Sequence, residues 1–228
     1  MTFMLNDPTL EAFLERLHQQ SHGQSPQIDE HFSLLSRTDR TQPLVDADAK
    51  AFLADKFVAL DRDKAEFCYA LCRSLGARQV VEAGTSYGVS TLYLAAAVRD
   101  TCAVSGGAGI VIGTEYEPAK AEAARKNFAA AGLSAFIDLR EGDLRETLQR
   151  IDGAVDFMLV DIWTPMARPA LELVAPHLRT GAIVVCDNTA DTRNDYRDYF
   201  EFIRAPGNGF RTMTLPFDGG FEFSVKCR

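Results

Sequence analysis

Short apolar runs alternate with longer amphipathic stretches from residue 79 onwards. The runs predict strands at 79–83, 110–115, 135–139, 155–161 and 182–187, and the stretches between them predict helices at about 89–99, 118–131, 143–150 and 166–178. One of these helices has Pro118 in its first turn and Gly132 after its end, as helix termini favour. This alternation predicts a parallel sheet covered by helices on both faces.

The chain closes with a different pattern. A helix at 195–204 precedes two apolar runs, 210–215 and 221–227, and the turn at Asp218-Gly219-Gly220 predicts that they pair as an antiparallel hairpin. The complete prediction is therefore an α/β fold with five parallel strands and a C-terminal antiparallel hairpin.

The segment before the sheet predicts helices. The first carries an apolar stripe made of Leu5, Leu10, Phe13, Leu14 and Leu17. A second is expected at 46–60 with Asp46 as its N-cap, and a third at 64–75 ends at Gly76. We expect residues 1–60 to form a helical cover over the substrate side or a candidate dimer interface, and residues 61–228 to form the main domain.

Composition narrows the function classes. The chain has 228 residues, 46% of them hydrophobic, and a net charge of −8, which disfavours nucleic-acid binding. No apolar run is long enough to cross a bilayer, and the N-terminus lacks the order of a signal peptide. The five cysteines contain no CxxC pair, so structural zinc and a disulfide framework are not expected. We therefore expect a soluble cytoplasmic protein that acts on a small molecule.

The first predicted strand leads into the glycine-containing loop Glu82-Ala83-Gly84-Thr85-Ser86-Tyr87-Gly88. Glycines allow a ligand to approach the backbone, and the amides that open the next helix favour an anionic group. Ser86 stands where a dinucleotide-binding motif needs its middle glycine, so pyrophosphate binding fits poorly. An ordinary strand-to-helix turn is the simpler alternative.

Polar residues follow each of the other parallel strands. Glu115 can accept both hydroxyls of a ribose, and Asp143 can meet an adenine edge, although both positions also suit the start of a helix. Asp161 follows the fourth strand, and Asp187 and Asn188 follow the fifth. Their oxygens suit Mg²⁺, Ca²⁺ or Mn²⁺, whereas the simpler alternative is that they cap turns.

These motifs together resemble the class I S-adenosylmethionine-dependent methyltransferases, and within them the cation-dependent O-methyltransferases related to the catechol and caffeoyl-CoA enzymes. The resemblance covers about residues 64–228. It implies a Rossmann-like, doubly wound sheet of seven strands in which the last strand lies between the fifth and the sixth. It also implies an S-adenosylmethionine site formed by Glu82, Gly84, Thr85, Ser86, Gly88, Ser90, Glu115, Asp143 and Asp161, a divalent metal on Asp161, Asp187 and Asn188, and Asp161 as a catalytic residue.

One position departs from the family. Thr164 stands where catechol-type members have the lysine that takes the acceptor's proton, and threonine is not basic at neutral pH. Candidate replacements are Lys56, Lys64 and His31, while His177 is expected to be structural and Trp163 either lines the acceptor pocket or lies in the core.

Three hypotheses therefore stay open at this point. The first is an O-methyltransferase assisted by a divalent metal and acting on a small, catechol-like hydroxyl acceptor. The second is a metal-independent methyltransferase with another acceptor. The third is a non-catalytic module that binds S-adenosylmethionine.

Overall fold

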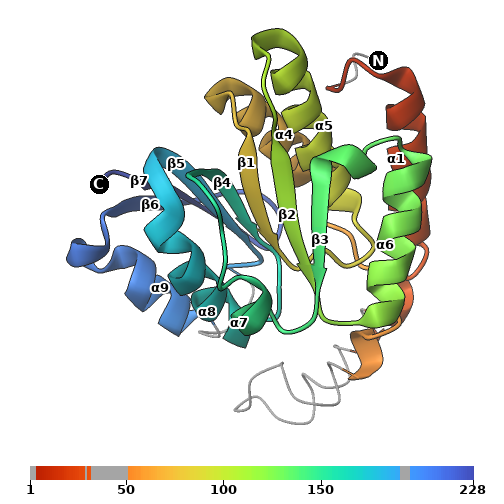
Figure 1. Cartoon of the computed structure of the whole chain (residues 1–228). Coiled ribbons are helices and arrows are strands. Elements are labelled where there is room, and N and C mark those ends of the chain that lie inside the picture. The colour runs from red at the N-terminus through yellow and green to blue at the C-terminus, as the bar shows by residue number, and fades with distance from the viewer. Residues whose placement is uncertain (1–3, 29, 32–50, 191–195) are drawn as a thin grey trace.

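A single seven-stranded sheet forms the centre of the molecule (Figure 1). The computed structural model describes residues 4–28, 30–31, 51–190 and 196–228. The strands are β1 (Gln79–Ala83), β2 (Ile110–Glu115), β3 (Ile137–Glu141), β4 (Val155–Val160), β5 (Leu178–Asp187), β6 (Phe210–Leu215) and β7 (Phe221–Lys226). Their order is β3-β2-β1-β4-β5-β7-β6. The predicted fold class is confirmed, including the last strand between the fifth and the sixth.

Helices cover both faces of this sheet. Their bounds are α1 (Pro8–His22), α4 (Arg62–Leu75), α5 (Val89–Ser105), α6 (Pro118–Ala130), α7 (Leu144–Thr147), α8 (Thr164–Val174) and α9 (Arg197–Arg204), with short 3₁₀ turns at Ser134–Phe136, Ala175–His177 and Pro206–Asn208. One apolar core joins the sheet to α1, α4, α5 and α6, and a second joins it to α7, α8 and α9. Within the described ranges, no helix is long and apolar enough to cross a membrane.

The strand order sets the position of the site. β1 pairs in parallel with both β2 and β4, and β4 pairs in parallel with β5. The chain therefore moves from β1 outwards to β3 and then returns to β4 on the other side of β1. Ligands of open parallel sheets bind outside the carboxyl ends of the strands at such a reversal.

Several predicted boundaries were wrong. Residues 54–60 lie outside any helix although the predicted helix spanned 46–60, of which 46–50 lie outside the described residues. The third strand begins at Ile137, because a 3₁₀ turn takes up Ser134–Phe136. β5 begins at Leu178, four residues earlier than expected, since Gly181 adopts a positive φ of 82° within the strand and interrupts its apolar pattern.

Helix α1 packs on α5 through apolar and polar contacts. Asp7 caps α1 by accepting from the Leu10 amide, and its other oxygen accepts from Arg99 on α5. His18 is buried and its Nε2 lies 3.1 Å from the Tyr93 hydroxyl. The N-terminal helix is thus bound to the main domain by specific buried groups.

The buried imidazole of His18 makes the stability of this contact depend on pH. Burial and the nearby Arg62 lower the pKa of His18 below its ordinary value of 6.5. The unfolded chain therefore binds this proton more readily, and the free energy of unfolding falls as pH falls below 6.5. The free energy of unfolding of the wild-type protein should fall between about pH 7.5 and about pH 5.5. We expect this fall to be about 1 kcal/mol smaller in His18→Gln, measured by urea unfolding.

The matched control is His22→Gln, because His22 is exposed on the same helix. It should keep the pH dependence of the wild-type protein. An unchanged pH dependence in His18→Gln would contradict the assignment.

Candidate functional site

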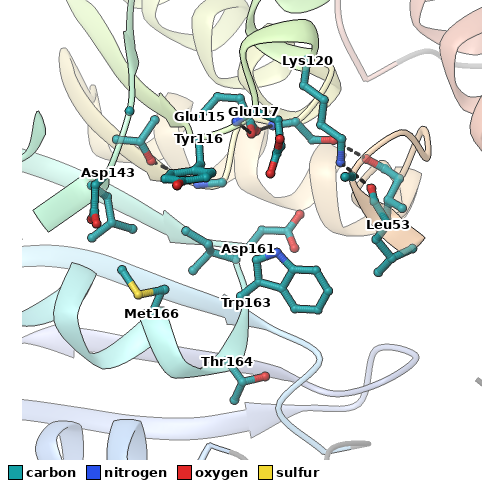
Figure 2. A pocket seen from close by; sticks show the side chains of 18 of the residues that line it. Leu53, Glu115, Tyr116, Glu117, Lys120, Asp143, Asp161, Trp163, Thr164 and Met166 are labelled. Carbon is teal, nitrogen blue, oxygen red and sulfur yellow. Dashed lines mark hydrogen bonds between the residues drawn. The ribbon is translucent and has the colours of Figure 1, made fainter. Parts of the chain in front are cut away.

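A cavity of about 550 Å³ lies at the carboxyl ends of the parallel strands. Gly84 follows β1, Glu115 ends β2, Asp161 follows β4 and Asn188 follows β5. The remaining lining residues are Leu53, Ala54, Val58, Ser86, Thr114, Tyr116, Glu117, Lys120, Gly142, Asp143, Leu144, Arg145, Ile162, Trp163, Thr164, Met166 and Tyr196. Figure 2 shows Glu115 from the end of β2, and Asp161 and Trp163 from the segment after β4, around this space.

The loop after β1 is anchored by Glu82. This carboxylate is fully buried, and it accepts hydrogen bonds from the hydroxyls of Thr85 at 2.8 Å, Ser90 at 2.6 Å and Thr91. Burial raises the pKa of Glu82, while the three hydroxyl donors act in the opposite direction. Glu82 therefore lies beneath the pocket wall and fixes the loop from below, as do Thr85 and Ser90.

The same loop approaches β4 so closely that only glycine fits. Gly84 has a φ of 97°, and a Cβ there would lie 1.9 Å from the carbonyl oxygen of Asp161. The Asp161 amide donates to the Ala83 carbonyl at 3.0 Å, which joins the two strand ends. Gly88 does not line the pocket, and a Cβ there would lie 2.3 Å from the Phe128 ring of α6.

Glu115 is held by two backbone amides. Its Oε2 accepts from the Ser86 amide at 2.7 Å and its Oε1 accepts from the Glu117 amide at 2.8 Å. Ser86 adopts a φ of 49°, which is uncommon outside glycine and directs its amide towards the carboxylate. The Glu115 carboxylate is thus fixed on the wall between β1 and β2.

Asp143 lines the cavity next to Glu115, because it follows β3, which pairs with β2. It caps α7 by accepting from the Arg145 amide at 2.9 Å, and the Arg145 guanidinium binds both of its oxygens. Asp143 therefore caps a helix and also lines the cavity, while its contact with adenine stays a prediction.

Buried charges are concentrated behind Asp161. Burial raises the pKa of Asp161 well above its usual range, and the charges of Asp187 and Glu82 raise it further. Asp187 is buried and its Oδ1 lies 2.8 Å from Nζ of Lys64. Burial, the largest single effect, lowers the pKa of Lys64, but the charges and hydrogen bonds of Asp187 and Asp61 together raise it above its ordinary value, so the side chain is an ammonium.

This ion pair tests the predicted metal set. Mg²⁺ binds oxygen at about 2.1 Å, so an ion on the Asp187 oxygen that Lys64 occupies would lie within about 5 Å of Nζ. Charges of +2 and +1 at that distance repel by about 7 kcal/mol at an effective dielectric constant of about 20. Across the ranges that the structure describes, no three His, Cys, Asp or Glu side chains are grouped to hold a metal. The arrangement does not fit a divalent ion on Asp187 Oδ1.

Comparison with known proteins agrees with this geometry. Residues 81–189 match a family model described as a methyltransferase domain. This part of the chain, just under half of its length, is therefore similar to methyltransferase domains. The matched residues include the glycine-containing loop after β1, Glu115, Asp161 and Asp187, so most residues that line the pocket lie within the matched region.

Related proteins support the same assignment. A catechol O-methyltransferase from Mycobacterium tuberculosis is 30% identical over 132 residues, which cover 58% of this chain and 57% of that protein. The chain thus spans little more than half the length of this relative. The predicted resemblance to methyltransferases of the catechol branch is confirmed.

Solved structures share the fold. Cofactor-bound Rv0187 from MTB has a TM-score of 0.66 at 25% identity, covering 85% of this chain and 94% of that chain. An O-methyltransferase from Bacillus cereus in complex with SAH has a TM-score of 0.64 at 23% identity, covering 74% of this chain and 82% of that chain.

The other residues singled out from the sequence lie in different places. Trp163 and Thr164 line the pocket. Lys56 is paired with Asp55, and His31 stacks on Phe52 with ring centroids 3.7 Å apart, so neither lines the cavity. His177 immediately precedes β5 and therefore lies at the edge of the sheet away from the site.

Two sets of residues that line the pocket were not named individually from the sequence, although residues 1–60 were expected to cover the substrate side. Residues Leu53, Ala54 and Val58 reach the cavity from the N-terminal segment, where the sequence has no motif. Lys120 of α6 also lines it, and its Nζ donates to the Leu53 carbonyl at 2.9 Å, a contact visible in Figure 2. The sequence did contain a signal for Lys120. It lies in the first turn of the helix that begins at Pro118, directly after the strand that ends at Glu115, so it is close to the cavity.

Substitution of Gly84 tests the close approach of the loop after β1 to the Asp161 carbonyl. We expect Gly84→Ala to lower the free energy of unfolding by about 2–5 kcal/mol, combining about 1–2 for the left-handed backbone with about 1–3 for overpacking. Gly132→Ala is the matched control, because it has a φ of 67° but no atom within 4 Å of the added carbon. Urea unfolding compares the two, and equal losses would contradict the close approach.

Proposed function

We propose that the protein is an S-adenosylmethionine-dependent O-methyltransferase that acts on the hydroxyl of a small molecule. The observation that carries this proposal is the cavity at the carboxyl ends of the parallel strands, which Gly84, Glu115 and Asp161 line from three strand ends, within the region that matches a methyltransferase model. The relative from M. tuberculosis is a catechol O-methyltransferase, which supports the proposed reaction. The O-methyltransferase from B. cereus was solved in complex with SAH, which supports the proposed cofactor.

The wall residues suit the parts of this cofactor. The loop at Gly84 and Ser86 offers backbone to the methionine end, while Glu115 accepts from the two ribose hydroxyls through the lone pairs that its backbone amides leave. Asp143 lies beside the adenine, with Tyr116 and Leu144 on the same wall. The cofactor sulfonium then lies near the side chain of Asp161.

The acceptor enters on the side of Trp163. Ile162, Trp163, Met166 and Tyr196 give this part of the cavity an apolar and aromatic lining, which suits a small flat molecule. In the reaction, the acceptor oxygen bonds to the methyl carbon, the carbon–sulfur bond breaks and the hydroxyl proton leaves. Holding oxygen, carbon and sulfur in line is the main contribution of the protein, which can supply about 7–11 kcal/mol.

Asp161 is the residue that we place at the reacting atoms. Its carboxylate lies beside the Trp163 ring in the middle of the cavity (Figure 2). A carboxylate in this position can receive the acceptor's proton, a role for which Thr164 has no basic group.

A catechol is the acceptor that the named relative suggests. The divalent cation stays a prediction, and the Lys64–Asp187 ion pair favours the metal-independent alternative. A homodimer, a cytoplasmic location and the domain boundary after residue 60 stay predictions as well.

Cofactor binding tests the first half of the proposal. We expect S-adenosylhomocysteine to bind the wild-type protein in calorimetry, and Glu115→Gln to weaken it roughly 10- to 100-fold, because hydrogen bonds to a charged group are lost. Glu122→Gln on the exposed face of α6 is the control and should bind as the wild-type protein does. Wild-type affinity in Glu115→Gln would contradict the assigned orientation.

Turnover tests the second half. A panel of hydroxylated aromatic acceptors is incubated with S-adenosylmethionine, and methyl ethers are detected by mass spectrometry. We expect product from the wild-type protein and roughly 100-fold less from Asp161→Asn, as for loss of a proton acceptor. Cofactor binding without any product would favour the non-catalytic binding module.

A further inference from the structure

Lys64 is a buried ammonium located behind the pocket. It lies in the first turn of α4, and its side chain is 1% exposed. Its Nζ lies 2.8 Å from Asp187 Oδ1 and 3.0 Å from Asp61 Oδ2. A lysine is almost never buried to this extent unless it is paired, and here both pairing carboxylates are present.

The surroundings of Lys64 are otherwise acidic. Asp161 and Asp187 follow neighbouring parallel strands, whose last paired residues are Val160 and Cys186. Glu82 is buried on the adjoining strand β1, and its charge acts on Asp161. The charge of Lys64 opposes these effects at Asp161 as well as at Asp187.

We propose that the Lys64 ammonium is the resident cation of this site and takes the place in which the family resemblance predicts a divalent metal. The ion pairs of Lys64 are independent of the proposed function, whereas their relevance to methyl transfer rests on it. In this site the Lys64 side chain, in place of a bound metal ion, supplies the positive charge beside the buried carboxylates.

Lys64 also positions a wall of the pocket. The Asp187 Oδ1 that binds Lys64 accepts from the Asn188 amide at 2.8 Å. Asn188 lines the cavity with a φ of 56°, a conformation that asparagine tolerates better than most residues. Lys64 therefore acts through Asp187 on Asn188 and is a positioning residue that does not touch the cavity.

Manganese binding tests the proposal without any reference to turnover. Mn²⁺ is titrated into the full-length protein and free Mn²⁺ is followed by electron paramagnetic resonance. We expect no site in the wild-type protein that depends on Asp187. Lys64→Met keeps most of the length of the side chain and removes its charge. We expect this variant to gain Mn²⁺ affinity by at least roughly tenfold, because the carboxylates around residue 64 are no longer paired with an ammonium.

Lys56→Met is the matched control. Lys56 is a partly buried lysine of the same region, but its partner is the exposed Asp55, so this variant should bind Mn²⁺ no better than the wild-type protein. Lys64→Arg keeps the charge and should also gain nothing. If Lys64→Met fails to fold by circular dichroism, Lys64→Gln is measured in its place.

Two results would overturn the proposal. One is a stoichiometric Mn²⁺ site in the wild-type protein that Asp187→Asn abolishes. The other is a folded Lys64→Met that gains no Mn²⁺ affinity. S-adenosylhomocysteine binding is measured on the same samples with chelator and with Mg²⁺, and we expect less than about a twofold difference for the wild-type protein. Failure of the proposed function would appear as absent S-adenosylhomocysteine binding, whereas failure of this proposal appears only in the Mn²⁺ titration.

Discussion

The buried carboxylate of Glu82 is the interaction on which the site depends. It is fully buried at the end of β1 and accepts from three hydroxyls, two at the start of α5 and one in the loop between them. A buried charge of this kind is costly unless its hydrogen bonds are satisfied, so strand, loop and helix must keep one arrangement. That arrangement places Gly84 against Asp161 and directs the Ser86 amide to Glu115.

A second constraint follows from the first. Because Glu82, Asp161 and Asp187 end three adjacent strands, the fold brings negative charges together in an apolar setting. Such a group needs a cation, and Lys64 supplies one from α4. The same helix packs against α5, so the core and the charge balance of the site depend on the same pair of helices.

Local patterns predicted most of this arrangement. Apolar periodicity located every strand of the sheet, and residues that follow strands, such as Glu115 and Asp161, reached the cavity because parallel strands end at one edge. Glu82 is fully buried beneath the loop, a position that a one-dimensional pattern does not reveal, and its contact with the cofactor stays a prediction. Lys64 was considered as a base, whereas its pairing with Asp187 joins residues 123 positions apart and depends on tertiary packing.

The central claim is that the cavity between Gly84, Glu115 and Asp161 is the cofactor site. A crystal structure of the protein grown with S-adenosylhomocysteine tests it most directly. We expect ligand density in this cavity, with both ribose hydroxyls within hydrogen-bonding distance of Glu115 and the sulfur on the side of Asp161. A ligand bound elsewhere, or one whose ribose faces away from Glu115, would contradict it.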